Sequence, residues 1–277
     1  MKEERHSLEK KIVFFDLDGT LFTHDKKILE STKHALKALQ NKGVYTAICT
    51  GRAPLMFERL LDELSFDSYV SMNGQHVVCE GNEIFSNPMK QEDMAKLTEM
   101  ANEKGHGLTY STFNTFVSNT SEHPLITDST ARLKIPYPPV DSEIFINSGV
   151  NQVQLYCPAE EAEEYIELFG DHTFIRWDKT SVDMLPAGAS KAIGIQKMLE
   201  FLDIPIENSY AFGDGLNDLQ MIETVGTGIA MDNAISELKE VADLITDSCD
   251  DDGILKGLMK VGLLEEDEVP SLQGSKK

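Results

Sequence analysis

Cysteines are few in this sequence, and long apolar runs are missing. The chain of 277 residues holds four cysteines, which are scattered without a C-x-x-C pair. Neither a disulfide framework nor a zinc site of ordinary spacing is therefore indicated. No apolar stretch approaches the roughly 20 residues that cross a bilayer, and the N-terminal sequence lacks the apolar region of a secretory signal. We expect a cytoplasmic protein without a membrane-spanning segment.

Basic residues are also scarce. The chain has 25 Lys and Arg against 47 Asp and Glu, which gives a formal net charge of -22. Proteins hold nucleic-acid phosphates with clustered Lys and Arg, but the longest basic runs here are the pairs Lys10–Lys11 and Lys26–Lys27. This charge pattern argues against partners such as nucleic acids and membrane surfaces. Apolar residues make up 41% of the chain, enough to build the core of one large or two moderate domains.

Strand and helix patterns alternate along both ends of the chain. Residues 12–15 are an unbroken apolar run, as expected of a strand that is buried on both faces. Between about residues 83 and 185 helical patterns mix with β-rich segments, and after Pro186 the alternation resumes. We therefore expect an α/β fold. A Rossmann-like, doubly wound parallel-sheet core is predicted over 1–82 and 186–277, with a separate α+β domain inserted at 83–185.

The same patterns predict the individual elements. Helices are expected from Ser31 to about Gly43, after Pro54, at 90–104, 159–169 and 190–202, after Leu216, and at 234–241. Strands are expected at 12–15, 44–50, 68–72, 108–112, 153–157, 173–177, 181–185, 209–213, 228–231 and 242–246, and a hairpin at 75–85.

Two groups of acidic residues follow predicted strands of the core. Asp16 and Asp18 come directly after the first strand, and the sequence Gly-Asp-Gly-Leu-Asn-Asp at 213–218 ends the strand at 209–213. Ligands of open α/β sheets bind at the carboxyl ends of the strands, so both groups are expected in one crevice. Carboxylates in such a place suit Mg²⁺. The alternative is that both are ordinary turns, because Asp and Gly are common turn residues.

Two further segments are suited to binding an anion. Thr50-Gly51-Arg52 follows the second strand just before a helix, and a helix N-terminus binds anions. Lys191 opens the helix after the insertion, where a cation is misplaced against the helix dipole unless an anionic ligand is present. The alternatives are a routine helix cap for Thr50 and a solvated surface side chain for Lys191.

Taken together, these segments resemble the four motifs of the haloacid dehalogenase (HAD) superfamily of phosphohydrolases. The motifs are D-x-D-G-T at 16–20, T-G-R at 50–52, P-x-G-x-S-K ending at Lys191, and G-D-G-x-N-D at 213–218. The Asn73-Gly74 turn and the place of the insertion resemble the Cof-type branch, subfamily IIB, of sugar and cofactor phosphatases. This resemblance covers the chain from about Lys11 to Leu264. It implies that the core is catalytic and that the insertion at 83–185 is a cap that sets substrate specificity.

The resemblance also implies roles for single residues. Asp16 is the expected nucleophile, which forms an aspartyl-phosphate, and Asp18 the general acid and base. The cofactor Mg²⁺ is expected on Asp16, the backbone carbonyl of Asp18 and Asp214, with Asp218 supporting the site directly or through water. The phosphoryl oxygens are expected to bind Leu17, Thr50, Gly51, Lys191 and Asn217.

The predicted function is a Mg²⁺-dependent phosphatase for a small phosphorylated metabolite, either a sugar phosphate or a cofactor phosphate. Candidate substrate contacts are Arg52, Asn73, Arg176 and Trp177, although a Trp is more often a core residue. One alternative is a phosphomutase of the phosphomannomutase type, which must bind a second phosphate, usually with Arg. Another is a non-catalytic protein that senses a phosphometabolite. The substrate stays open, as does the choice between monomer and homodimer.

Overall fold

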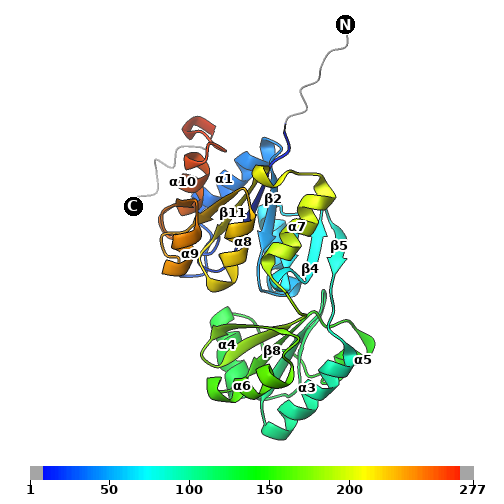
Figure 1. Cartoon of the computed structure of the whole chain (residues 1–277). Helices are drawn as coiled ribbons and strands as arrows, with labels where there is room; N and C mark the ends of the chain where they lie inside the picture. The colour runs from blue at the N-terminus through cyan, green and yellow to red at the C-terminus, as the bar shows by residue number, and fades with distance from the viewer. Residues whose placement is uncertain (1–8, 269–277) are drawn as a thin grey trace. The chain divides into compact units, whose positions relative to one another are not determined.

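The computed structural model describes residues 9–268, which divide into two compact units (Figure 1). The first unit contains residues 9–49, 63–69 and 195–268, and the second contains Thr50–Asp62 and Val70–Gly194. The division thus assigns 50–62, 70–82 and 186–194 to the same unit as the inserted segment. The domain boundaries drawn from the sequence pattern, after residues 82 and 185, stay a prediction.

The first unit is built on a parallel sheet. Neighbouring strands follow the order β13-β12-β11-β1-β2, and each pair is parallel. The strands are β1 (Ile12–Phe15), β2 (Tyr45–Cys49), β11 (Ser209–Gly213), β12 (Thr227–Ala230) and β13 (Leu244–Ile245). All four residues of β1 are buried, because its apolar run is covered on both faces. The predicted α/β fold with a parallel sheet is confirmed.

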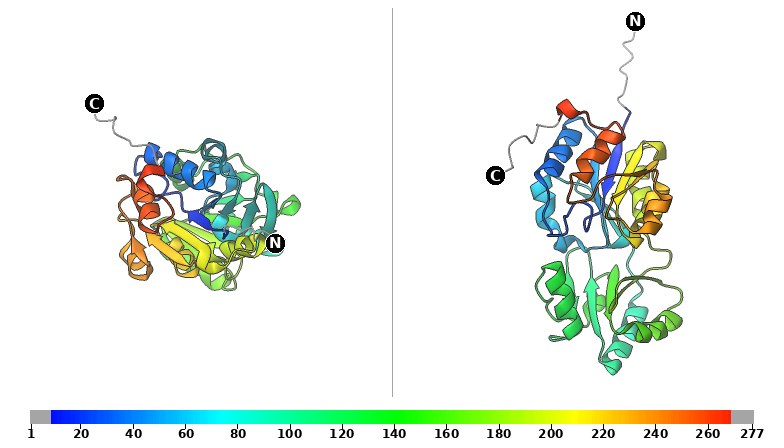
Figure 2. Two further views of the ribbon diagram at one scale, coloured as in Figure 1. Left: turned by 90° about the horizontal axis from the view of Figure 1, so that it is seen from above. Right: turned by 90° about the vertical axis from the view of Figure 1, so that its left-hand side faces the viewer.

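Helices cover both faces of this sheet. Figure 2 shows α1 and α10 on one face and α8 on the other, and α1 packs against α10 while α8 packs against β12. The helices of this unit are α1 (Glu30–Asn41), most of α7 (Lys191–Leu202), α8 (Leu219–Thr224), α9 (Ser236–Val241) and α10 (Gly253–Lys260). None of the helices in the described part of the chain is long and apolar enough to cross a membrane.

Several element boundaries of the first unit differ from the prediction. The helix expected from Ser31 begins one residue earlier, with Leu29 at its N-cap. The helix expected after Leu216 starts as a 3₁₀ turn, Leu216–Asp218, before α8. Helix α10 is absent from the predicted elements, because the acidic residues before it are typical of a turn. Ile254 and Leu258 of α10 are buried and fix that helix to the core.

The division between the units runs through two short elements. The helix predicted after Pro54 is a 3₁₀ turn, Pro54–Met56, followed by α2 (Glu58–Leu64). Strand β3 (Tyr69–Ser71) leads into a turn in which Asn73 has φ 51° and Gly74 has φ 90°. An added Cβ at Gly74 would lie 2.0 Å from the carbonyl oxygen of Ser190, so this turn requires glycine.

The second unit contains a five-stranded sheet in the order β7-β6-β8-β10-β9, in which every pair is antiparallel. Its strands are β6 (Gly107–Ser111), β7 (Phe116–Ser118), β8 (Gln152–Tyr156), β9 (Thr173–Asp178) and β10 (Ser181–Leu185). The unit also contains the antiparallel hairpin of β4 (His76–Cys79) and β5 (Asn82–Ser86). The hairpin and the long helices at 90–104 and 159–169 are confirmed as β4–β5, α3 (Gln91–Lys104) and α6 (Ala159–Leu168). Strand β7 and the helices α4 (Pro124–Leu133) and α5 (Ile144–Asn147) were not predicted.

The two faces of the five-stranded sheet differ in polarity. Alternate residues of β6, β8 and β10 point to opposite faces, and one set forms an apolar core with α3 and α6: Leu108, Tyr110, Val153, Leu155, Val182 and Met184. The other set is polar yet also buried: Thr109, Gln152, Gln154, Tyr156 and Asp183. Buried polar groups must find hydrogen-bond partners, so this polar face is held by a side-chain network.

Candidate active site

Three carboxylates meet at the carboxyl edge of the parallel sheet. Asp16 follows β1 and Asp214 follows β11, and the register pairs Phe15 with Phe212, so both strands end side by side. Carboxylate oxygens of Asp16, Asp214 and Asp218 all lie within 4.8 Å of one another. The exposed fraction is 6% for Asp16 and 0% for Asp218. The structure therefore brings together the two acidic groups that the sequence analysis expected at one edge.

The donor set fits a divalent cation. Three carboxylates at this spacing repel one another in a site with little access to water, and a bound cation removes that repulsion. Hard oxygen donors are the ligands that Mg²⁺ prefers. Asp218 also shapes the loop, because its Oδ2 accepts the backbone N–H groups of Asp214 and Gly215, each at 2.9 Å. One of its oxygens is thus used in holding the turn that presents Asp214.

Asp18 lies outside this carboxylate cluster and has a partner of its own. The Nζ of Lys26 donates to its Oδ1 at 2.5 Å. Lys26 adopts a left-handed backbone conformation, with φ 59°. In the sequence Lys26 is only half of a basic pair, and no motif signals a lysine eight residues after Asp18. The ammonium group of Lys26 therefore holds the Asp18 side chain in one orientation.

The loop between these aspartates is closely packed. Gly19 has φ +76°, and an added Cβ would lie 2.1 Å from Oδ2 of Asp214, so only glycine fits. Thr20 is buried, and its Oγ1 has no hydrogen-bond partner among the described residues. Leu17 is fully buried in the same loop, and Asn217 lies in the 3₁₀ turn after β11. These residues all belong to the first unit.

Thr50, Gly51 and Lys191 belong to the second unit. Thr50 is buried, and its Oγ1 accepts the backbone N–H of Arg52 at 3.2 Å. The carbonyl of Gly51 accepts Nε2 of Gln152 at 3.1 Å. Lys191, the first residue of α7, is 0% exposed, so the alternative of a solvated surface lysine is wrong. Lysines are rarely buried unless paired with an anion. That these residues bind a phosphoryl group stays a prediction.

The candidate substrate contacts have protein partners in the second unit. Trp177 donates from Nε1 to Oδ1 of Asp183 at 2.9 Å, and Asn73 donates from Nδ2 to Oδ2 of the same residue at 3.3 Å. Arg176 donates to the backbone carbonyls of Asp178 and Lys179, both at 3.3 Å. A local turn therefore engages the guanidinium of Arg176, whereas Asn73 and Trp177 share one acceptor.

Asp183 is the functional candidate that the sequence analysis missed. It is 4% exposed, and burial raises the pKa of its carboxyl from 3.8 to about 7, although hydrogen bonds from Trp177, Gln154 and Asn73 oppose the shift. The alternation along β10 places it opposite Val182 and Met184, on the polar face of the sheet. That alternation is visible in the sequence, but the burial of the polar face is not.

Comparisons with known proteins agree with these observations. Residues 13–258 match the family model of the haloacid dehalogenase-like hydrolases. YkrA of Bacillus subtilis (strain 168) is 41% identical over 258 residues, which cover 93% of this chain and 100% of that protein. The crystal structure of a protein from Geobacillus kaustophilus HTA426 superimposes with a TM-score of 0.87 at 46% identity, covering 92% of this chain and 100% of the other.

A further solved structure carries a functional description. The HAD subclass IIB sugar phosphatase BT4131 superimposes with a TM-score of 0.82 at 28% identity, and the match covers 92% of this chain and 100% of the other. HAD phosphatases generally use a divalent metal, and the carboxylate cluster fits one. The chain therefore belongs to the haloacid dehalogenase superfamily, in its Cof-type branch, subclass IIB, and is a phosphatase of small phosphorylated substrates.

Proposed function

We propose that the protein is a Mg²⁺-dependent phosphatase that hydrolyses a sugar phosphate or a cofactor phosphate through an aspartyl-phosphate on Asp16. One observation carries the proposal: carboxylate oxygens of Asp16, Asp214 and Asp218 converge within 4.8 Å at the end of β1 and β11. A nucleophilic carboxylate needs its charge offset before it can approach an anionic phosphate. Mg²⁺ bound to Asp16, Asp214 and the carbonyl of Asp18 would supply that offset, with Asp218 in support.

The first half of the reaction is the transfer of the phosphoryl group to Asp16. A carboxylate oxygen of Asp16 forms a bond to phosphorus as the bond from phosphorus to the leaving oxygen breaks. Asp18 gives its proton to that leaving oxygen, so the product alcohol departs neutral. Lys26, which contacts Oδ1 of Asp18, keeps the acid pointing in one direction.

The second half releases inorganic phosphate. A water molecule attacks phosphorus and gives a proton to the Asp18 carboxylate, which is thereby ready for the next cycle. The bond between phosphorus and Asp16 breaks, and the electron pair returns to the Asp16 carboxylate. Charge stabilisation and positioning supply most of the catalysis in phosphoryl transfer. We assign these tasks to the donors Leu17, Thr50, Gly51, Lys191 and Asn217.

A small, polar leaving group suits the second unit. Its sheet carries the buried, largely uncharged polar side chains of Thr109, Gln152 and Gln154 beside Asp183, and such groups bind hydroxyls rather than a second phosphate. The similar structure BT4131 is named a sugar phosphatase. A phosphomutase is disfavoured because Arg132 pairs with Asp178 at 2.9 Å and Arg176 binds backbone carbonyls. They are the only arginines of 83–185, and both are already engaged.

The test is release of inorganic phosphate from sugar phosphates, nucleotides, pyridoxal phosphate and aryl phosphates. Each is assayed with Mg²⁺ and with a chelator, using the native chain, Asp16→Asn, and Asp128→Asn as a matched control on an exposed face of α4. We expect turnover that requires both Mg²⁺ and Asp16 and that Asp128→Asn leaves intact. Turnover by folded Asp16→Asn at the native rate would refute the mechanism. Binding of these compounds without any turnover by the native chain would favour the sensing protein.

A further inference from the structure

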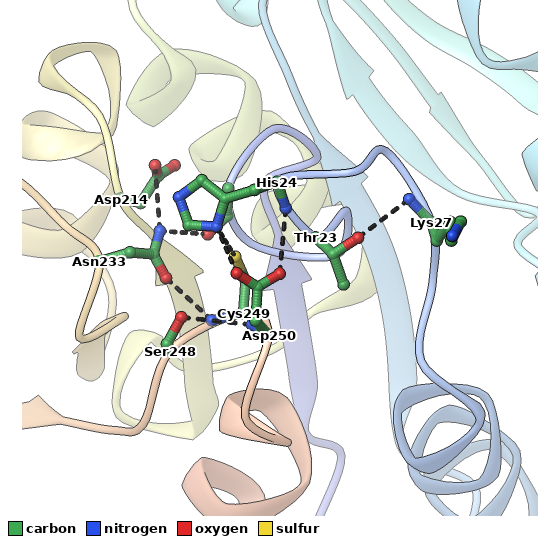
Figure 3. A network of polar contacts seen from close by, with 9 residues as sticks. Thr23, His24, Lys27, Asp214, Asn233, Ser248, Cys249 and Asp250 are labelled. Carbon is green, nitrogen blue, oxygen red and sulfur yellow. Dashed lines mark hydrogen bonds and ion pairs between the residues drawn. The ribbon is translucent and has the colours of Figure 1, made fainter.

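The side chain of Asn233 joins three loops of the first unit at the carboxylate cluster. Asn233 lies in the turn between β12 and α9. Its Nδ2 donates to the carbonyl oxygen of Gly19 at 2.8 Å and to Oδ2 of Asp214 at 3.4 Å, and its Oδ1 accepts the backbone N–H of Cys249 at 2.9 Å. Figure 3 shows the amide pointing between Asp214 on one side and Cys249 on the other.

The chemistry of these contacts requires an amide. Two acceptors, a carbonyl and a carboxylate, face one end of Asn233, while a donor, the Cys249 N–H, faces the other. Among neutral side chains of this length, only an amide offers donors at one end and an acceptor at the other. An aspartate at 233 would present oxygens to both Gly19 and Asp214. The contact with Asp214 is long for a hydrogen bond, at 3.4 Å, so the 2.8 Å bond to the Gly19 carbonyl is the stronger of the two.

The joined segments carry the residues of the proposed site. Gly19 belongs to the loop that bears Asp16 and Asp18, and it approaches Asp214 so closely that a Cβ would lie 2.1 Å from Oδ2 of that residue. The backbone of Asp214 is tied to the same turn as Asn233, because its carbonyl accepts the N–H of Ile235 at 3.0 Å. Asn233 therefore sets the position of the Asp214 carboxylate relative to the Asp16 loop.

A second set of contacts holds the loop that supports Asn233. Asp250 accepts the backbone N–H of His24 with Oδ1 at 3.1 Å and contacts the ring Nδ1 of His24 with Oδ2 at 2.5 Å. His24, Cys249 and Asp250 have the types of side chain that bind metals, and their ligand atoms lie within 4.8 Å of one another. However, both oxygens of Asp250 are used by His24, and burial raises the pKa of the Cys249 thiol, which disfavours a thiolate ligand. We interpret this cluster as a structural contact that holds the loop at His24 against the loop at 249–250.

We propose that Asn233 is a positioning residue of the active site, whose amide holds the Asp214 carboxylate against the loop of Asp16 and thereby preorganises the carboxylates for a divalent cation. The inference rests on the proposed function for the identity of the cation. Partners that orient metal ligands typically contribute about 10- to 100-fold to metal affinity. Loss of the amide removes the contact that joins the Asp214 carboxylate to the Gly19 carbonyl, so the cost falls on Mg²⁺ affinity first.

The test measures Mg²⁺ binding to the whole chain by isothermal titration calorimetry, without substrate. We expect Asn233→Ala to raise the Mg²⁺ dissociation constant about 10- to 100-fold. Asn119→Ala is the matched control, because Asn119 also bridges segments, accepting the N–H of Leu108 at 2.7 Å and donating to the carbonyl of His106 at 3.1 Å, but lies in the second unit. Both variants should melt at a lower temperature, and only Asn233→Ala should change Mg²⁺ affinity.

A kinetic readout separates positioning from stability. Turnover of Asn233→Ala should recover as Mg²⁺ is raised, with a larger change in the half-saturating Mg²⁺ concentration than in kcat. If Asn233→Ala does not fold, Asn233→Ser, which keeps one donor, should show a smaller shift in the same direction. Native Mg²⁺ affinity in folded Asn233→Ala or in folded Asn233→Ser overturns the inference. A native chain that binds no Mg²⁺ would refute the proposed function. A native chain that binds Mg²⁺, with Asn233→Ala binding it equally well, would refute this inference alone.

Discussion

The two units bury aspartates at nearly the same depth but compensate their charge differently. In the first unit Asp16, Asp214 and Asp218 lie within 4.8 Å of one another. In the second unit Asp183 is a lone carboxyl among neutral donors, and its pKa is raised to about 7. A cluster of carboxylates is compensated by a cation, whereas a lone buried carboxyl is compensated by a proton. The first arrangement is therefore suited to a divalent cation and the second to a proton.

The sheets explain where each arrangement arises. In the parallel sheet of the first unit both faces are covered, so polar side chains gather where the strands end. In the antiparallel sheet of the second unit one face is apolar and the other polar, so Asp183 lies within a strand rather than at its end. The position of an aspartate along its strand thus distinguishes the two roles in this molecule.

The largest expected effect is on turnover, and it should differ between Asp214 of the first unit and Asp183 of the second. Asp214→Asn removes one of the cation's carboxylates and should lower the turnover of a responsive phosphate ester on the order of 10²-fold or more at limiting Mg²⁺. Asp183→Asn should keep turnover within about tenfold, because an amide still accepts from Trp177. Steady-state rates of both variants over a Mg²⁺ series provide the measurement. Equal losses in the two variants would contradict the division of roles.

Metal removal should change the stability of the chain through the first unit. Mg²⁺ at about 100 times its dissociation constant should raise the free energy of unfolding by about 2.7 kcal/mol, because it binds only the folded cluster. Urea unfolding with Mg²⁺ and with a chelator measures this difference. Asp214→Asn should abolish the gain and Asp183→Asn should retain it. A gain that survives in Asp214→Asn would place the ion elsewhere.

Two glycines with similar backbone angles sharpen the comparison further. Gly19 in the first unit has φ +76° with Asp214 against it, and Gly105 in the second has φ +71° with nothing within 4 Å. Gly105→Ala should cost about 1 kcal/mol of unfolding free energy, the backbone penalty alone. Gly19→Ala should cost about 2 kcal/mol or more and also weaken Mg²⁺ binding, because its Cβ displaces the Asp214 carboxylate. Similar costs at both positions would mean that the loop at 19 relaxes freely.

The smallest expected effect is a dependence of stability on pH that comes from Asp183. Its pKa is about 7 in the folded chain against an ordinary value of 3.8. Between about pH 4 and 7 the folded state therefore holds a proton that the unfolded state has released, so stability falls as pH rises across this range and levels off above it. The free energy of unfolding should drop by about 1 kcal/mol between about pH 6 and 8, and Asp183→Asn should flatten the curve.

Trp177 provides an optical check of the same titration. It is the only tryptophan of the chain and donates to Asp183, so its fluorescence should change with a midpoint near pH 7. The Asp183→Asn variant should show no such transition. A native chain whose fluorescence and stability are flat across this range would contradict the raised pKa.

Sequence patterns predicted the parts of the molecule that depend on local order. The apolar run of β1 and the acidic residues after it were sufficient to place Asp16 at a strand end, and parallel pairing brought Asp214 to the same edge. The helix α10 was missed because Asp250, Asp251 and Asp252 before it are typical of a turn. Its buried Ile254 and Leu258 are too few to reveal a helical period.

The contacts that the sequence did not predict join residues far apart along the chain. Asn233 bonds Gly19, and Asn73 bonds Asp183, across separations of 214 and 110 residues. The sequence marks Asn73 as a candidate substrate contact, but it does not predict the partner of either asparagine, because Asn is common in turns for local reasons. Lys26 is only eight residues from Asp18, yet it becomes a partner of Asp18 only through the fold of the loop between them. Such partners follow from packing rather than from pattern.

The most direct test of the central claim is to trap the phosphoryl group on the protein. The native chain, Asp16→Asn and Asp18→Asn are mixed with p-nitrophenyl phosphate labelled at phosphorus in the presence of Mg²⁺, quenched in acid, and the denatured protein is counted before and after hydroxylamine. We predict hydroxylamine-sensitive label on the native chain and more of it on Asp18→Asn. The p-nitrophenolate leaving group needs no acid, so the first step still proceeds in Asp18→Asn, whereas the second step lacks its base. Asp16→Asn should carry none. Turnover by the native chain without label in either protein that retains Asp16 would contradict the claim.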